Sequence, residues 1–141
     1  MSETPAAKSL PVVSFVKIPD EGAPYMEGFR CDKCNEVFLA DHPSCANCYA
    51  RGSLKATRLA DTGKLYNFTV VHRNFPGVPV PFVSAIVDLD GGGTVKGNLI
   101  DIVPSPEAIK FDMPVKVVFA GAGRKDKDGN SYLAYFFKPA A

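Results

Sequence analysis

Four cysteines are the residues of this chain whose types and spacing are best suited to chemistry. Cys31 and Cys34 form one C-x-x-C pair, Cys45 and Cys48 form a second, and ten residues separate the pairs. A C-x-x-C turn directs two sulfur atoms at one metal ion, and two such turns supply the ligands of a tetrahedral zinc site. The spacing therefore predicts one structural Zn²⁺ ion per chain, bound by all four cysteines.

The predicted metal site is closed. A zinc ion with four protein ligands has no position for water or substrate, so it cannot act as a Lewis acid. We therefore expect it to stabilise the fold, with a rubredoxin-like iron centre and dithiol chemistry as open alternatives. His42 lies between the pairs and is an alternative ligand, although four sulfurs suffice. Asn35 after Cys34 suits the positive φ angle that such turns often need, whereas Tyr49 after Cys48 does not.

The composition indicates an ordinary globular protein. Of its 141 residues 46% are hydrophobic and 22% charged, and the net charge is +1. Zinc bound by four thiolates would change this charge to about −1, which argues against a polyanion binder. No apolar run is long enough for a bilayer, and the first residues do not form a signal sequence. We therefore expect a cytoplasmic protein, whose reduced cysteines favour metal binding over disulfides.

The other polar residues do not form a catalytic pattern. His72 suits a surface or sheet position, with a contact to a phosphate or a partner chain as its functional alternative. Asp88, Asp90 and Asp101 fall at expected strand ends, where aspartate favours turns. We expect no catalytic residue in this chain.

Three segments must position the cysteines. We expect an N-terminal arm over residues 1–27, the zinc ribbon over 28–52 and an OB-fold domain over 53–141. Prolines and glycines exclude a long helix in the arm, whose apolar residues pack either on their own domain or on a partner protein. The ribbon contains few apolar residues, so a metal must supply much of its stability.

The segment after residue 53 is rich in β-branched and aromatic residues bounded by glycine and proline. A tight hairpin is expected at Gly91–Gly93 and a short helix over 105–111. The expected strands are 64–75, 81–89, 94–102, 114–121 and 131–139. Five strands with one interruption predict a mainly β protein, in which a rubredoxin-like zinc ribbon is followed by a five-stranded OB-fold barrel. A small β-sandwich is the alternative.

These segments together resemble the acyl-CoA-associated OB-fold proteins with an N-terminal rubredoxin-like zinc ribbon. Beyond the ribbon, the resemblance rests on Gly63–Arg73, Pro81–Asp90, Gly97–Ile100, Met113–Phe119 and Phe137–Pro139. Two departures occur: the stretch before the second cysteine pair lacks the Pro-Arg of many members, and prolines break the helix that often precedes the ribbon. Both bear on the partner surface and leave the metal ligands intact.

The resemblance implies a non-catalytic accessory subunit of an acyl-CoA thiolase-type complex. A thiolase-like partner would carry the catalytic cysteine and histidine and would cleave a 3-oxoacyl-CoA by thiolysis. The layout is similar to that of the small subunits of benzylsuccinyl-CoA thiolases, which serve aromatic degradation. A heterotetramer of two small and two large chains is implied, with acyl-CoA at the interface. An aldolase or a hydratase is the alternative partner.

Two other binding roles stay open at this point. Four basic residues near the ribbon and the first strand either contact the phosphates of coenzyme A or form a solvated surface. They are Arg51, Lys55, Arg58 and Arg73. Single-stranded nucleic-acid binding is the second function class, because OB-folds and zinc ribbons both serve there. It would need aromatic platforms, for which Tyr66, Phe68, Phe75 and Phe82 are available. The near-neutral charge argues against it.

Overall fold

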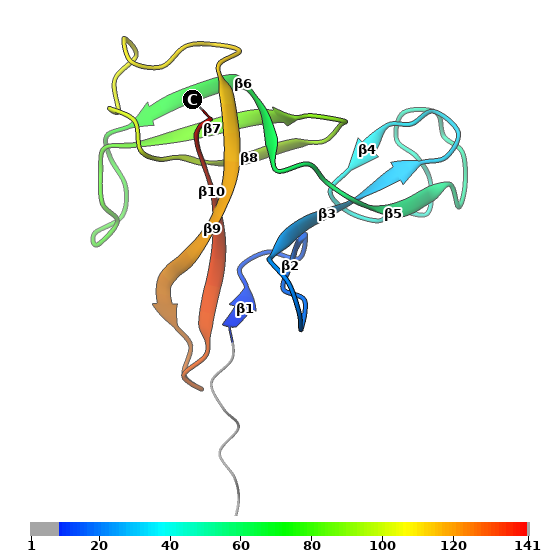
Figure 1. Ribbon diagram of the computed structural model, residues 1–141, viewed down its shortest axis with the longest axis horizontal. Helices are drawn as coiled ribbons and strands as arrows, with labels where there is room; N and C mark the ends of the chain where they lie inside the picture. Colours follow the sequence, from blue (N-terminus) through cyan, green and yellow to red (C-terminus); the bar gives the residue numbers. More distant parts are fainter. Residues whose placement is uncertain (1–8, 141) are drawn as a thin grey trace, which may run out of the picture.

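The computed structural model of the chain describes residues 9–140. Within this range all regular secondary structure is β, and the strands form a barrel and a smaller ribbon (Figure 1). Residues 1–8 of the expected N-terminal arm lie outside the described residues. In the described part of the chain, no helix is long and apolar enough to cross a membrane.

Five strands form the barrel: β6 (Thr62–Val71), β7 (Phe82–Leu89), β8 (Thr94–Leu99), β9 (Pro114–Lys125) and β10 (Ser131–Pro139). β6 pairs with β7, β7 with β8, β8 with β10 and β10 with β9, and β9 returns to β6 to close the ring. Every pairing is antiparallel except β8–β10. This order and direction are those of the OB-fold, so the predicted fold class is confirmed and the sandwich alternative is wrong.

Several predicted bounds differ from the structure. β8 ends at Leu99 and not at residue 102, and β9 continues to Lys125 beyond the predicted end at residue 121. β6 ends at Val71, before the predicted end at residue 75. Val71 pairs with Phe82, so the next partner position is Pro81, which has no N–H group to continue the ladder.

Residues 105–111 form a turn and no helix: the Ala108 amide donates to the Ser105 carbonyl over 3.1 Å. Asp112 then adopts a φ angle of 62°, which ends any right-handed helical path.

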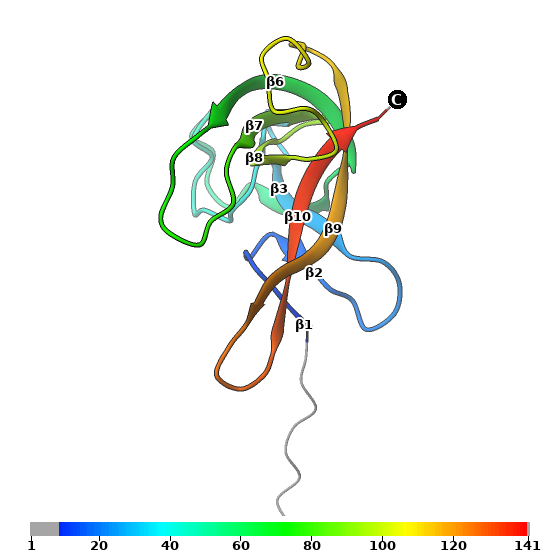
Figure 2. The ribbon, with the colours of Figure 1, turned by 90° about the vertical axis from the view of Figure 1, so that its left-hand side faces the viewer.

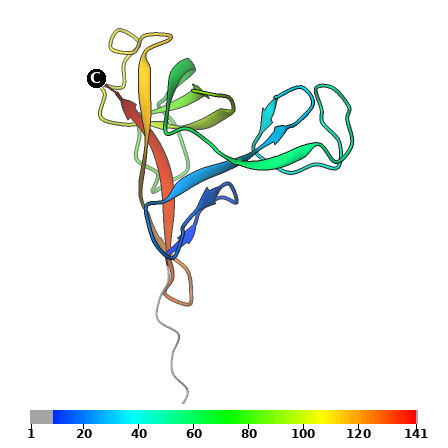
Figure 3. The same ribbon diagram turned by 45° about the vertical axis from the view of Figure 1, so that its right-hand side comes forward.

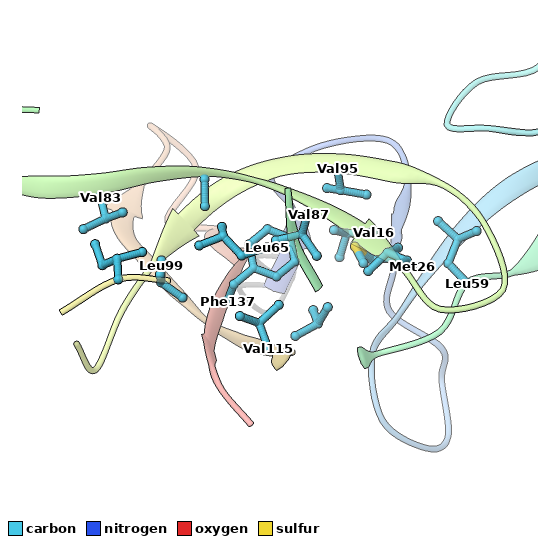
Figure 4. Packing of buried hydrophobic residues seen from close by; sticks show 14 of the residues in the cluster. Val16, Met26, Leu59, Leu65, Val83, Val87, Val95, Leu99, Val115 and Phe137 are labelled. Carbon is cyan, nitrogen blue, oxygen red and sulfur yellow. The ribbon is translucent and has the colours of Figure 1, made fainter. Parts of the chain in front are cut away.

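The barrel interior is a packed apolar core. Inward and outward side chains alternate along the strands, so that β7 buries Val83, Ala85, Val87 and Leu89. Leu65 of β6 and Phe137 of β10 meet near the centre, each with 0% of its surface exposed (Figure 4). Burial of a side chain of this size stabilises the fold by about 1.5–3 kcal/mol.

A small antiparallel sheet forms the ribbon. It consists of β3 (Tyr25–Cys31) between β4 (Val37–Phe38) and β5 (Leu54–Arg58). A Cβ atom on Gly28 of β3 would lie 2.7 Å from the Phe38 carbonyl oxygen, so this position requires glycine. The sheet uses residues on both sides of the expected ribbon segment 28–52, and the exact domain boundaries stay a prediction.

Two short strands precede the ribbon. β1 (Ser9–Pro11) pairs with β10 in parallel, and β2 (Val16–Lys17) pairs with β3 (Figure 2). Val16 is fully buried and Phe15 packs against the barrel core, whereas Val12 and Ile18 are exposed. Most apolar residues of the described arm therefore pack on their own chain.

The ribbon is docked on the hairpin between β7 and β8, whose tip points towards it (Figure 3). The Arg30 guanidinium donates a hydrogen bond of 2.7 Å to the Gly91 carbonyl oxygen. A Cβ atom on Gly92 would lie 2.7 Å from a methyl carbon of Val37, so the backbone of the hairpin touches the ribbon closely. Val37 and Leu59 belong to the same buried cluster as the barrel residues. One continuous core therefore joins the two units.

Candidate metal centre

The structure brings all four predicted cysteines together. Their sulfur atoms lie within 4.8 Å of one another, with 3.7 Å between Cys31 and Cys48 and 3.6 Å between Cys34 and Cys45. Sulfurs in a tetrahedral zinc site with Zn–S bonds of about 2.3 Å lie about 3.8 Å apart. A disulfide would need about 2 Å, and all four cysteines are free. The donor set and its spacing therefore fit a Zn²⁺ ion.

Two turns of the same geometry present the sulfurs. In the first, the Asn35 amide donates to the Cys31 carbonyl over 2.9 Å, and Asn35 has a φ angle of 66°. In the second, the Tyr49 amide donates to the Cys45 carbonyl over 2.9 Å, and Tyr49 has a φ angle of 65°. The expectation for Asn35 is confirmed. Tyr49 adopts the same strained φ angle although its residue type does not favour it. Its side chain is 80% exposed, so what it contributes to the turn is its backbone conformation.

Several donors favour the thiolate form of these cysteines. The Ser53 hydroxyl lies 3.2 Å from the Cys31 sulfur, and this buried hydrogen bond is the main reason why the pKa of Cys31 is lowered to about 6. The Asn47 side-chain amide donates to the Cys34 sulfur over 3.4 Å and lowers the pKa of Cys34. Ser53 and Asn47 are partners of the cysteine sulfurs that the spacing of the cysteines does not reveal.

Cys48 behaves differently from Cys31. The backbone at Ala50 lowers its pKa, but desolvation and the three neighbouring sulfurs outweigh this effect and raise the pKa of Cys48 to about 12. Four thiols this close oppose one another's ionisation, so a bound dication is needed for all four to be thiolates. When bound, zinc would cross-link the two turns, held by Cys31, Cys34, Cys45 and Cys48.

The other candidate residues do not join this group. His42 and His72 are both exposed, and His72 lies in the loop after β6. Among the described residues, the group that can hold a metal consists of the four cysteines alone. Asp88 and Asp90 accept hydrogen bonds from the Thr94 and Thr62 hydroxyls, over 2.8 Å and 2.7 Å, as expected for carboxylates at strand ends.

The basic and aromatic candidates are dispersed over the molecule. Arg51, Lys55 and Arg58 belong to the ribbon region, whereas Arg73 follows β6 in the loop at the opposite end of the barrel (Figure 1). Tyr66 and Phe75 are 62% and 81% exposed, so neither ring is part of the buried core. Phe68 is half-buried and contacts the Phe111 ring.

Comparison with known proteins gives matches along most of the chain. The family described as "ChsH2, C-terminal OB-fold domain" matches residues 56–120. A "DUF35 domain-containing scaffold protein" of Methanocaldococcus jannaschii is 30% identical, with 79% of either chain covered. The "Benzoylsuccinyl-CoA thiolase subunit BbsA" of Geobacter metallireducens is 29% identical over 86% of this chain and 80% of the relative.

A solved structure supports the same relationship. The chain titled "Ltp2-ChsH2(DUF35) aldolase" is 27% identical, with a TM-score of 0.64 and coverage of 83% of this chain and 86% of that one. The thiolase relative is named for a benzoylsuccinyl thioester, where the resemblance stated above has benzylsuccinyl. Thiolysis requires a ketone, which a benzoyl group supplies and a benzyl group lacks. By name, these three relatives are a scaffold protein, a subunit of a benzoylsuccinyl-CoA thiolase and an aldolase.

Proposed function

The chain belongs to the DUF35 family of OB-fold proteins, and from this premise we propose that it is the non-catalytic subunit of an acyl-CoA complex with a thiolase-type catalytic chain. The observation that carries the proposal is its similarity to the thiolase subunit BbsA, which extends over ribbon and barrel alike. A scaffold name for the relative from Methanocaldococcus jannaschii supports a role in assembly rather than in bond cleavage.

The interior of the chain is consistent with such a role. Among the described residues, Ser53 is the buried polar residue, and its hydroxyl contacts a cysteine sulfur. The remaining buried cluster is apolar, and the barrel is filled by its own side chains. The groups that would transfer protons or attack a carbonyl are therefore assigned to the partner chain.

The proposed reaction proceeds on the partner. A cysteine thiolate of the catalytic chain attacks the ketone carbon of a 3-oxoacyl-CoA, and the bond between carbons 2 and 3 breaks. The leaving carbanion takes a proton and departs as acetyl-CoA or its counterpart. Free CoA then accepts the acyl group from the cysteine, which regenerates the thiolate. This chain positions the substrate channel, and its zinc-bound ribbon keeps the contact surface rigid.

An aldolase partner is the second candidate, because the solved relative with a TM-score of 0.64 is titled an aldolase. The two reactions differ in their need for CoA. Thiolysis consumes one CoA per bond cleaved, whereas retro-aldol cleavage of a 3-hydroxyacyl-CoA releases an aldehyde or ketone and consumes none. An assay with and without free CoA therefore separates the two classes.

Co-purification tests the proposal. The chain is tagged in its own cells, and the complex is isolated and assayed for CoA-dependent cleavage of 3-oxoacyl thioesters. We expect a thiolase-type chain in a complex of two small and two large subunits, and we expect its activity or solubility to be lost without this chain. A catalytic chain that is fully soluble and active alone would contradict the proposal.

Contacts between this chain and coenzyme A are part of the proposal. Arg51, Lys55 and Arg58 are the candidates on the ribbon side, and Arg73 is the candidate at the far end of the barrel. These two groups lie at opposite ends of the molecule (Figure 1). We therefore expect that neutral substitutions on the ribbon side and a neutral substitution of Arg73 change the Michaelis constant for the thioester by different amounts.

A further inference from the structure

The longest strand of the barrel has an unpaired edge. β9 pairs with β10 as far as Lys125, but on its other side β6 pairs only with Pro114–Lys116. The final bond on that side joins the Val117 amide to the Asp61 carbonyl over 2.7 Å. Beyond Val117, no described strand covers this edge of β9.

The register of the ladder identifies the unpaired groups. Phe137 lies opposite Val117, and its carbonyl accepts a hydrogen bond from the Ile100 amide. The Val117 amide donates to Asp61, so Val117 and Phe137 form a non-hydrogen-bonded pair. Phe119 and Gly121 follow Val117 at steps of two residues. Their N–H and C=O groups therefore point away from β10, towards the open edge. Such an edge is a template for another extended chain.

A groove runs beside this edge. Its volume is about 390 Å³, and its lining includes Val117 and Phe119 of β9 together with Tyr25, Arg58 and Asp61. The Arg58 guanidinium lies 4.6 Å from the centre of the Tyr25 ring. Within the described residues it makes no hydrogen bond and no ion pair. The groove therefore combines the free edge of β9 with a cation that has no bonded carboxylate in the described part of the chain.

From this juxtaposition we propose that the β9 groove binds an extended segment of the catalytic partner subunit, which joins β9 as an added strand and places an acidic side chain beside Arg58. Strand addition uses the main chain for affinity and side-chain contacts for specificity. This inference rests on the proposed function, because it names the surface on which the partner docks.

Charge favours a partner chain over a second copy of this chain. β9 contains Lys116, Arg124 and Lys125 and no acidic residue. A second copy of this basic strand laid along the edge would bring like charges together, which is destabilising. An acidic guest strand is attracted by the same residues.

Proline at position 121 tests the backbone contact. Gly121→Pro removes an N–H group from the open edge only, and Gly121→Ala is its matched control, because a Cβ atom there meets nothing within 4 Å. Arg58→Gln tests the charge, and Lys110→Gln on the exposed turn before β9 is the control for loss of one positive charge. Each variant is isolated as the tagged full chain with its partner, and its own fold is checked by circular dichroism.

We expect Gly121→Pro to weaken the complex at least tenfold and Arg58→Gln to weaken it severalfold, with both controls unchanged. Hydrogen exchange at residues 119 and 121 should slow at least tenfold in the complex relative to the free chain. A complex that forms normally with both variants and leaves these amides unprotected would overturn the groove assignment and leave the proposed function intact. A homodimer that Gly121→Pro dissociates would overturn the groove assignment alone, whereas a wild-type chain without a catalytic partner would overturn both.

Discussion

The ribbon and the barrel are stabilised in different ways although they belong to one chain. The ribbon cluster has Cys31, Cys45 and Leu54 as its buried members, with Phe29 and Phe38 packed against it. The barrel cluster has fifteen buried residues, which include whole rows of inward side chains. Two of the three buried members of this cluster are also candidate metal ligands, so loss of a bound metal would remove most of what holds the cluster together. The barrel has no such dependence.

Removal of a ligand should have the largest effect. We expect Cys31→Ser to abolish binding of the one zinc ion per chain and to unfold the ribbon, because structural zinc contributes on the order of 10–16 kcal/mol of apparent binding energy. The barrel amides should stay protected. Metal analysis and residue-resolved hydrogen exchange measure both effects.

The control for this change is Lys33→Ala, an exposed residue within the same turn, which should keep its metal. A Cys31→Ser ribbon that retains its exchange protection would show that packing, not metal, stabilises the ribbon.

The converse change acts on the barrel. Phe137→Ala removes a fully buried ring and should cost about 3–5 kcal/mol, measured as a lower urea midpoint. Phe75→Ala at the 81% exposed loop position should change stability by less than about 0.5 kcal/mol. We expect the ribbon of Phe137→Ala to retain its zinc in urea concentrations that unfold the barrel. Simultaneous loss of metal would show that the two units unfold together.

A third change separates the two units at their junction. Gly92→Ala combines a φ angle of 118° with a Cβ atom 2.7 Å from Val37, and should cost about 1–3 kcal/mol. Gly91→Ala has a φ angle of 82° and no atom within 4 Å, so it isolates the backbone strain from the contact. The difference in unfolding free energy between the two variants reports the tightness of docking. Equal values would mean that the ribbon is not held against this hairpin.

The smallest effect should come from the hydroxyl beside the metal. Ser53→Ala removes the 3.2 Å contact to the Cys31 sulfur and should weaken zinc binding about tenfold, as loss of a group that hydrogen-bonds a ligand commonly does. Competition with a chelator measures the affinity. Ser44→Ala, an exposed serine of the same ribbon, is the control and should leave the affinity unchanged.

The metal group and the barrel could be predicted because each is encoded locally. Two C-x-x-C turns place their sulfurs by backbone geometry alone, and the barrel strands follow from short runs of β-branched and aromatic residues between glycines and prolines. The hairpin at Gly91–Gly93 follows likewise, since all three residues take positive φ angles.

The remaining features depend on contacts between distant residues. β3 pairs with β5, and β1 pairs in parallel with β10. These strands have no local sequence pattern that predicts their distant partners. Ser53 and Asn47 become ligand partners only once the chain has folded back on the first turn. The prediction of a helix over 105–111 was wrong. A capping pattern indicates where a helix can begin but not that the next residues continue it, and the positive φ angle of Asp112 prevents continuation.

The closure of the barrel by β10 has a consequence for folding on the ribosome. Among the described residues β10 is the strand furthest along the sequence, and it bonds to β8, to β9 and to β1. The barrel therefore cannot complete its ring until residue 139 has been synthesised, whereas β3, β4, β5 and all four sulfurs have been synthesised by residue 58. A nascent chain that binds a metal at this stage would have a folded ribbon while the barrel was still being made.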